Sequence, residues 1–305
     1  MKTHPSESHH KILQAYQQNL QQVVGLSPKT CRDRIRDVRH FLEAVHVRRI
    51  GNLAELTAVD LVSHLTARSA DYTPASLRNV ASAVRSFLRF AQQRGWINQP
   101  LALAVPKIAC GAHHDLPFYL SGRQLESLLA SWDRGTAEGR RDRAIGLCLA
   151  RLGLRAGEVA GLLLEDIHWR QATVRISHIK NGSQAQLPLF SEVGQAVADY
   201  LSAGRPACTH RQVFLFHQPI RPMDSKAVSR VIQRALRRCG IEAPRLGAHL
   251  LRHTLASHLV QNGASLKEVA DLLRHRDLNS ASVYAHVDLP GLRPLAQPWP
   301  EEATL

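Results

Sequence analysis

The stretch His249-Leu250-Leu251-Arg252-His253, together with the segment from His275 to Tyr284, decides the fold of this chain. Residues three apart on a helix face the same side, so His249 and Arg252 should project together. His275 lies on the next predicted helix, and Tyr284 follows on a third. Two imidazoles, a guanidinium and a phenol are therefore expected to converge where a phosphate can bind.

These side chains suit a reaction at a DNA phosphodiester. A phenol can attack phosphorus and leave a phosphotyrosine and a free sugar hydroxyl, but with a pKa of about 10 it must first lose a proton. Arginine stays charged and binds two phosphate oxygens at once. Arg155, in Gly153-Leu154-Arg155, supplies a second guanidinium for the phosphate. Lys180, at the tip of a predicted hairpin, is a candidate acid for the leaving oxygen.

No metal and no cofactor are expected for this chemistry. Arginines take the place of a cation clamp, and the phosphotyrosine stores the bond energy until a second DNA hydroxyl recovers it. The five cysteines are scattered without a C-x-x-C pair, which argues against a zinc site or a disulfide framework. The pairs His9-His10 and His113-His114 lack Cys or acidic partners at ligand spacing and are interpreted as non-metal.

The chain is strongly basic. Its 305 residues carry a formal net charge of +14 and a pI near 10.3, which favours nucleic acid as a partner ahead of an anionic membrane. Aromatic residues make up only 5%, which favours duplex DNA over base-stacked single strands. No apolar run is long enough to cross a bilayer, and the N-terminus lacks the apolar region of a signal peptide. A cytoplasmic protein without a membrane partner is expected.

Residues 10–95 are predicted to form a small helical bundle. Helices are expected at 11–24, after the Ser27-Pro28 cap, at 57–68 and from Pro74, with residues 1–10 frayed. Apolar residues at helical spacing should point inward: Ile35, Val38, Phe41, Leu42, Val45, Leu77, Val80, Val84, Phe87, Leu88 and Ala91. Basic residues on other faces are predicted to bind DNA, with ordinary solvent-facing positions as the alternative: Lys29, Arg32, Arg36, Arg39, Arg78, Arg85 and Arg89.

A second domain is predicted to begin near residue 118. Residues 100–117 lack periodicity and contain several prolines, which is typical of a linker. Two β-prone runs, 172–179 and 184–189, flank the turn Lys180-Asn181-Gly182-Ser183, a strong hairpin signal. Helices are expected at 121–131, 140–152, 156–163, 192–203, 224–239, 248–262, 265–274 and 279–286. The sequence thus predicts a mainly α protein with a small antiparallel β-sheet in its second domain.

The whole pattern resembles the tyrosine recombinase (phage-type integrase) superfamily, with spacing closest to its Xer-type members. The resemblance covers nearly the whole chain. It implies a helical SAM-like core-binding domain at 1–99, a linker at 100–117, a catalytic domain at 118–290 and a C-terminal tail at 291–305. In this family the two domains close as a C-shaped clamp around duplex DNA. The resemblance implies six catalytic residues: Arg155, Lys180, His249, Arg252, His275 and Tyr284.

The resemblance also implies a role for each residue. Arg155 and Arg252 would bind the scissile phosphate, and Tyr284 would attack it to form a 3′-phosphotyrosine. Lys180 would protonate the leaving oxygen, and Glu158 would orient the site. The two histidines would assist, His249 in proton transfer and charge stabilisation and His275 by bonding the phosphate or the tyrosine.

The resemblance further implies how the protein holds its DNA. Basic residues of the helix at 224–239 would bind phosphates: Lys226, Arg230 and Arg234. Four protomers, alone or with related recombinases, would join two recombination sites and exchange strands in pairs. The expected partner is therefore duplex DNA bound by a homotetramer.

Three features depart from the family pattern. The family hairpin often reads Gly-Lys-Gly-x-Lys-x-Arg, whereas residues 178–186 keep only Lys180, with one residue inserted before it. Arg274 replaces the glycine of the family's Leu-Leu-Gly-His. Prolines between 290 and 300 argue against a long C-terminal helix and favour an extended tail ending in Pro298-Trp299-Pro300. The loosened hairpin and the proline-rich ending favour a mobile-element enzyme.

Several alternatives remain open. Within the family, the alternative role is Xer-type resolution of chromosome or plasmid dimers. A type IB topoisomerase-like relaxer shares the chemistry but not the partner sites. A non-catalytic DNA-binding accessory factor is disfavoured by the intact residue set, and an RNA-binding helical protein by the lack of aromatic platforms. His253 and His258 are interpreted as core histidines that bond to backbone.

Overall fold

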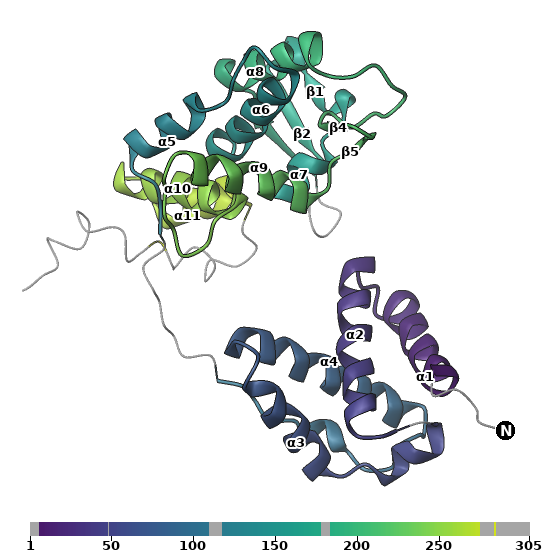
Figure 1. Ribbon diagram of the computed structural model, residues 1–305. Coiled ribbons are helices and arrows are strands. Elements are labelled where there is room, and N and C mark those ends of the chain that lie inside the picture. The colour runs from purple at the N-terminus through teal and green to yellow at the C-terminus, as the bar shows by residue number, and fades with distance from the viewer. Residues whose placement is uncertain (1–5, 48, 110–117, 178–183, 275–283, 285–305) are drawn as a thin grey trace, which may run out of the picture. The chain divides into compact units, whose positions relative to one another are not determined.

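The computed structural model describes residues 6–47, 49–109, 118–177, 184–274 and 284. The chain divides into two compact units, Met1–His113 and His114–Leu305 (Figure 1). Each unit has a hydrophobic core of its own, because the buried side chains form separate clusters on either side of the division. The expected mainly α, two-domain architecture with a small antiparallel sheet is confirmed.

The first unit is a helical bundle. It contains α1 (Ser6–Gln18), a π-helical turn η1 (Asn19–Val23), α2 (Pro28–Ala44), a 3-10 turn η2 (Ile50–Glu55), α3 (Ala58–Ser69), α4 (Pro74–Gln93) and a 3-10 turn η3 (Leu101–Leu103). The Ser27 hydroxyl caps α2 by accepting from the Thr30 amide, and Thr57 forms a capping box with Asp60 at the start of α3. The predicted caps therefore set the helix starts.

The core of the first unit is aromatic at its centre. The ring of Tyr16 contacts Phe87 edge-on and Phe90 at a tilt, each with 5.4 Å between ring centroids. Every residue of α4 predicted to point inward is buried. On α2, Val38, Phe41 and Leu42 are buried as well. This packing fixes α1 and α2 against α4.

Two segments of the first unit differ from prediction. α1 begins at Ser6 instead of residue 11, and the end of the expected helix, residues 19–23, winds as a π-helical turn. The segment expected to open the linker instead buries Leu101 and Val105 in the bundle core. Arg85 donates to the carbonyls of Val105 and Pro106. Tertiary packing against α4 thus holds a segment that lacks helical periodicity.

The second unit wraps helices around a central helix and two small sheets. Its elements are α5 (Gly122–Ala130), α6 (Ala137–Arg151), α7 (Ala156–Gly161), η4 (Leu164–Asp166), β1 (Ile167–His168), η5 (Trp169–Gln171), β2 (Thr173–Ile176), β3 (Ala185–Pro188), α8 (Ser191–Ala203), β4 (Leu215–His217), β5 (Ile220–Pro222), α9 (Ser225–Arg238), α10 (Ala248–Gln261) and α11 (Leu266–Leu272).

The central helix α6 is buried along its second half. All seven residues from Ala144 to Ala150 are buried, and α8, α10 and α9 pack around it. Gly146 is required there, because a Cβ at this position would lie 2.4 Å from the ring of Trp132. Since α6 ends just before Gly153-Leu154-Arg155, its burial fixes the position of that turn.

The two sheets are antiparallel. The first has the strand order β1-β2-β3, with Val174 opposite Leu187, and the second pairs β4 with β5. The hairpin predicted at 172–189 is therefore present as β2 and β3, while its turn, with Lys180, lies outside the described residues. The β4–β5 hairpin escaped prediction because its strands are only three residues long. The helix expected at 279–286 also lies outside, apart from Tyr284.

Candidate active site

The turn before α7 positions Arg155. Gly153 has a φ of +59°, in the left-handed region that favours glycine, and a Cβ there would lie 2.7 Å from the side chain of Leu273 at the end of α11. Arg155 is the N-cap residue of α7, and its amide donates to the Glu158 carboxylate at 2.9 Å. The Arg155 guanidinium bonds the other Glu158 oxygen at 2.8 Å. Arg155 is thus held by one carboxylate yet remains 40% exposed.

Among the arginines that the structure describes at this site, Arg252 is the most buried. Its side chain projects from α10 and is 1% exposed. The guanidinium donates to the backbone carbonyls of Gly153 and Leu273, so it joins three elements: α10, the turn before α7 and the end of α11. Burial, with the neighbouring charges of Arg155 and Arg274, lowers the pKa of Arg252 to about 10. The residue stays charged at neutral pH.

The carboxylate of Glu158 is shared between two arginines. Arg155 bonds Oε1, and Arg274 bonds Oε2 at 2.8 Å. Burial opposes ionisation, but the Arg155 hydrogen bonds and the Arg274 charge outweigh it and lower the pKa of Glu158. Three guanidiniums therefore accompany one carboxylate, which leaves an excess of positive charge suited to an anion.

The rings of two histidines of α10 lie tilted against each other beside this cluster. The rings of His249 and His253 lie four residues apart, with 4.4 Å between their centroids. The His249 side chain reaches solvent. Partial desolvation, with the positive charges of Arg252, Arg155 and Arg245, lowers the pKa of His249. His249 is therefore biased towards the neutral form that can accept a proton.

Tyr284 is buried against α10. It is 1% exposed, and its hydroxyl shares a 2.8 Å hydrogen bond with Nδ1 of His253. Burial raises the pKa of Tyr284 to about 12, although the Arg252 charge pulls in the opposite direction. The phenol is thus neutral at physiological pH and needs a partner to take its proton.

The contacts of His253 differ from those predicted from the sequence. It was expected to be a core histidine bonded to backbone, but its ring is half-buried and its Nδ1 binds Tyr284. His258 does follow that expectation, because its Nε2 bonds the Leu120 carbonyl at 2.8 Å. The sequence signal for His253 was its position four residues after His249, which places both on one face of α10.

Four of the six predicted catalytic residues lie in the described part of the chain, and the structure brings them together. Arg155, His249, Arg252 and Tyr284 surround the junction of α7, α10 and α11. Lys180 and His275 lie outside the described residues. Glu158, expected to orient the site, bonds Arg155 directly.

The basic residues of the first unit differ in what they contact. Lys29 pairs with Asp33 at 3.0 Å, and Arg36 pairs with the buried Asp37 at 2.8 Å. Four others are exposed: Arg32, Arg39, Arg78 and Arg89. Arg85 is instead engaged by backbone carbonyls, so its assignment as a DNA contact has less physical support than theirs.

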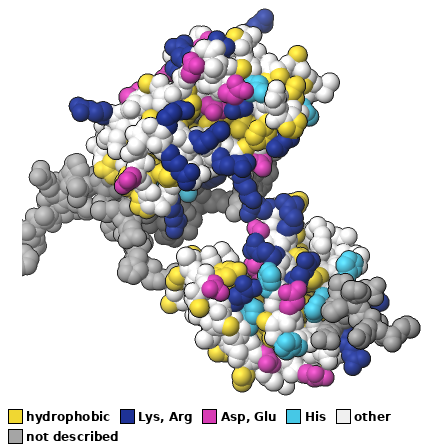
Figure 2. Space-filling view, viewed as in Figure 1, with side chains coloured by type: hydrophobic (Ala, Val, Ile, Leu, Met, Phe, Trp, Pro, Cys, Tyr) yellow, Lys and Arg dark blue, Asp and Glu magenta, His cyan; other side chains and the backbone are white. Residues whose placement is uncertain are grey.

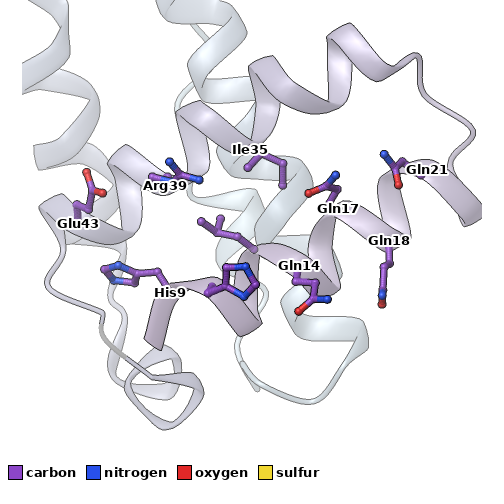
Figure 3. Close-up of a pocket in the computed structure, with 10 residues that line it drawn as sticks. His9, Gln14, Gln17, Gln18, Gln21, Ile35, Arg39 and Glu43 are labelled. Atoms are coloured by element: carbon purple, nitrogen blue, oxygen red, sulfur yellow. The ribbon is translucent and has the colours of Figure 1, made fainter. Parts of the chain in front are cut away.

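A groove between α1 and α2 carries amides beside this basic face (Figure 3). It encloses about 710 Å³ between the α1–η1 side chains and those of α2. Four glutamines line one wall, namely Gln14, Gln17, Gln18 and Gln21, while Arg39 and Glu43 stand on the other. A neighbouring hollow adds Arg32 and Arg36. The groove therefore offers many hydrogen-bond donors to a polar or anionic partner.

Lys and Arg side chains also gather on one face of the second unit (Figure 2). The three residues predicted on α9, Lys226, Arg230 and Arg234, are all exposed. Arg230 and Arg234 line a hollow of about 700 Å³ between α9 and the β4–β5 hairpin. The ring of Phe216, which also lines the hollow, carries the Arg221 guanidinium over its face, with 4.1 Å from Cζ to the ring centroid.

Within the described residues, no group of three or more His, Cys, Asp and Glu side chains is placed to hold a metal ion. In that same part of the chain, no helix combines the length and the apolar character that a membrane span requires.

Sequence profiles of two related domains match the chain. The phage integrase family matches residues 119–289, and the phage integrase N-terminal SAM-like domain matches residues 13–95. The first match extends over more than half of the chain and includes all the candidate catalytic residues, described or not.

Curated proteins resemble the chain over most of its length. "Putative integrase/recombinase y4rA" of Sinorhizobium fredii is 39% identical over 293 residues, which cover 95% of this chain and 71% of that protein. Tyrosine recombinase XerD of Listeria monocytogenes is 29% identical over 272 residues, covering 86% of this chain and 89% of XerD.

Solved structures share the fold of this chain at low sequence identity. A lambda integrase dimer bound to a COC′ core site aligns with a TM-score of 0.69 at 18% identity, covering 96% of this chain and 98% of that one. XerH site-specific recombinase bound to a palindromic difH substrate aligns with a TM-score of 0.70 at 17% identity, covering 95% of each chain. With the profile match and the y4rA identity, these findings place the chain in the phage integrase family of tyrosine recombinases, enzymes that cleave and rejoin DNA.

Proposed function

We propose that this protein exchanges strands between specific duplex DNA sites through a covalent bond between Tyr284 and a 3′ phosphate. One local arrangement carries the proposal. Arg252 is anchored between Gly153 and Leu273 beside Arg155, and the residue after it, His253, binds the Tyr284 hydroxyl. A nucleophile and a preorganised anion clamp therefore meet at one helix, α10.

The proposed step is a transesterification. Oη of Tyr284 bonds to phosphorus while the bond from phosphorus to the 5′ oxygen breaks. The phenol proton passes to Nδ1 of His253, and the 5′ oxygen takes a proton from Lys180. Attack by another 5′ hydroxyl on the phosphotyrosine reverses the step and joins the strands. The phosphodiester energy is conserved throughout.

Arg252 and Arg155, the two arginines proposed to bind the phosphate, differ in how firmly their side chains are held. Arg252 keeps its geometry through two backbone carbonyls, and Arg155 combines one carboxylate partner with 40% exposure. Both would neutralise charge on the non-bridging oxygens as the bond forms. His249 reaches solvent next to them and would add a hydrogen bond to the phosphate, as would His275. Because Tyr284 is 1% exposed, the phenol must shift towards an entering phosphate.

DNA binding would use exposed cations of both units. Arg32 and Arg39 lie beside the amide-lined groove of the first unit, and Arg230 and Arg234 line the hollow along α9. Such side chains bind phosphates without geometric constraint, so they would supply affinity that depends on salt concentration. Amides such as Gln17 and Gln21 are able to bond base edges.

The proposed assembly and biological role rest on the resemblance to the family more than on the geometry of the candidate site. A structure with the same fold is a lambda integrase tetramer bound to a Holliday junction, and a homotetramer on two sites is proposed for this chain. Integration, excision or transposition of a mobile element is favoured by the shortened lysine set of the hairpin and the proline-rich tail. Resolution of chromosome or plasmid dimers is the alternative, and XerD relatives support it.

A suicide duplex with a nick near the cleavage point tests the proposal. The 5′ fragment diffuses away after cleavage, so wild type should accumulate a covalent protein–DNA adduct on its own recombination site. Tyr284→Phe should give no adduct, while Tyr119→Phe, a matched control elsewhere in the same unit, should behave as wild type. Equal trapping by Tyr284→Phe and wild type would show that another residue attacks.

A further inference from the structure

Arg274 occupies a backbone position that favours glycine. It follows α11 with a φ of +53°, in the left-handed region where a Cβ is crowded. The Leu-Leu-Gly-His pattern noted above has glycine here, so the arginine introduces strain that glycine avoids. A residue that keeps such strain beside an active site invites a functional explanation.

The Arg274 side chain turns inward to the clamp. It is 9% exposed, and its Nη2 bonds Oε2 of Glu158 at 2.8 Å. The Arg274 carbonyl in turn accepts a hydrogen bond from Arg155 at 3.3 Å. Arg155, Glu158 and Arg274 therefore close a ring of contacts, with the carboxylate between two guanidiniums.

The remaining Arg274 donors support a role beyond packing. Nη1 bonds the Leu272 carbonyl at 3.2 Å, and Nε is buried without a hydrogen-bond partner among the described residues. Burying an unpaired guanidinium N–H is unfavourable. The side chain is thus retained despite two local penalties, one in the backbone and one in hydrogen bonding.

We propose that Arg274 is a positioning residue of the phosphate clamp, which neutralises Glu158 so that the charge of Arg155 acts on the DNA phosphate. Without Arg274, the carboxylate and Arg155 form a pair with no net charge. With Arg274 present, the same carboxylate still fixes Arg155 in place, and one positive charge remains for the phosphate. The inference rests on the proposed function, because it gives Arg274 a role through Arg155.

The contact between Arg274 and Glu158 should affect the pH dependence of cleavage. Burial raises the pKa of Glu158, and the Arg155 hydrogen bonds and the Arg274 charge bring it below its ordinary value. Arg252 lies near enough to feel the same carboxylate, while His249 and Tyr284, the titratable neighbours of Arg252, are biased towards their neutral forms. Removing Arg274 should raise the pKa of Glu158, so the acid side of the pH–rate profile should move to higher pH.

The test compares Arg274→Gly and Arg274→Lys with wild type in single-turnover cleavage at saturating DNA. Glycine relieves the backbone but removes the charge, and we expect cleavage to slow by about tenfold, less than the ~10²–10³ typical of a direct donor. Lysine restores the charge and should recover part of the rate. Two matched controls should cleave as wild type: Ala172→Gly, which relieves a φ of +48°, and Arg211→Gln, which breaks an exposed ion pair with Glu165.

A double-mutant cycle separates positioning from general damage. In a Glu158→Gln background there is no carboxylate to neutralise, so Arg274→Gly should cost little further rate. Wild-type rates for Arg274→Gly, or the full tenfold loss in the Glu158→Gln background, would overturn the inference. If Arg274→Gly fails to fold, Arg274→Lys and its pH profile carry the test. A wild type that forms no Tyr284 adduct would instead overturn the proposed function itself.

Discussion

The arginines of the candidate active site and those of the α2 face differ in what holds them. Arg252 is 1% exposed and bound to two backbone carbonyls, and Arg274 is paired with a buried carboxylate. On α2, Arg32 and Arg39 are exposed, and Arg39 borders the amide-lined groove while both border the hollow next to it. The same side chain is thus a fixed donor in one region and an adaptable one in the other.

Under the proposed function, this difference suits the arginines of the two regions to different tasks. A clamp that must meet a transition state gains from donors already in position, because no reorganisation is needed when charge develops. A surface that follows a DNA backbone gains from long side chains that adjust to each phosphate. Mutations in the two regions should therefore affect different measured quantities.

The sharpest way to break this comparison is Arg252→Gln. The variant removes the buried charge and weakens the bonds to Gly153 and Leu273, so we expect cleavage to fall by ~10³ or more. Thermal unfolding should begin at a lower temperature, because the buried carbonyls lose donors. Arg252→Lys keeps a charge and should retain more stability than Arg252→Gln. Cleavage within threefold of wild type for either variant would contradict a preorganised clamp.

His253→Ala tests the nucleophile's partner. The pKa of Tyr284 is raised to about 12, so very little phenolate exists at pH 7 without a proton acceptor. We expect cleavage to slow by ~10² at neutral pH. The deficit should shrink as pH rises, since the phenolate fraction grows about tenfold per pH unit below the pKa. His258→Asn, which changes the bond to the Leu120 carbonyl and the ring contact with Tyr119, is the matched control. Faster cleavage by His253→Ala would mean that the bond restrains Tyr284 instead.

The double variant Arg32→Ala/Arg39→Ala tests the adaptable face. Loss of two phosphate contacts should weaken DNA binding roughly tenfold. It should also reduce the slope of log affinity against log salt concentration by up to about two. The cleavage rate at saturating DNA should stay unchanged. Lys29→Ala should have a smaller effect, because Lys29 already pairs with Asp33. A reduced rate at saturation, with normal affinity, would place these residues in the chemistry.

His64 gives the smallest expected effect, on stability alone. It is 6% exposed beside Phe41, and burial lowers its pKa to about 4. A histidine with a folded pKa below its unfolded value stays neutral in the fold, so stability is full above about pH 6.5 and falls as pH drops towards 4. His64→Phe should make the first unit's unfolding free energy less dependent on pH in that window. An unchanged pH slope would show that His64 is not buried neutral.

Much of the fold was predictable because local signals and packing agree. The Ser27-Pro28 and Thr57 caps set helix starts, and the apolar spacing of α4 identified its buried face. At the site, the spacing of His249 and Arg252 on one helix predicted that they act together. Such features depend on neighbouring residues, which a sequence displays directly.

Features set by distant contacts were not predictable in the same way. The burial of Leu101 and Val105 depends on packing against α4, not on periodicity. The bond between His253 and Tyr284 joins residues from separate segments. The left-handed backbone of Arg274 was not predicted either, because its side chain bonds Glu158, which is distant in the sequence.

Mapping the attachment point of trapped DNA tests the central claim most directly. The chain has five tyrosines: Tyr16, Tyr72, Tyr119, Tyr200 and Tyr284. After digestion of the adduct with protease and nuclease, mass spectrometry should find a 3′-phosphonucleotide on the Tyr284 peptide alone. Attachment to any other residue, or a wild-type protein that never becomes linked to its own site, would contradict the assignment of Tyr284 as the nucleophile.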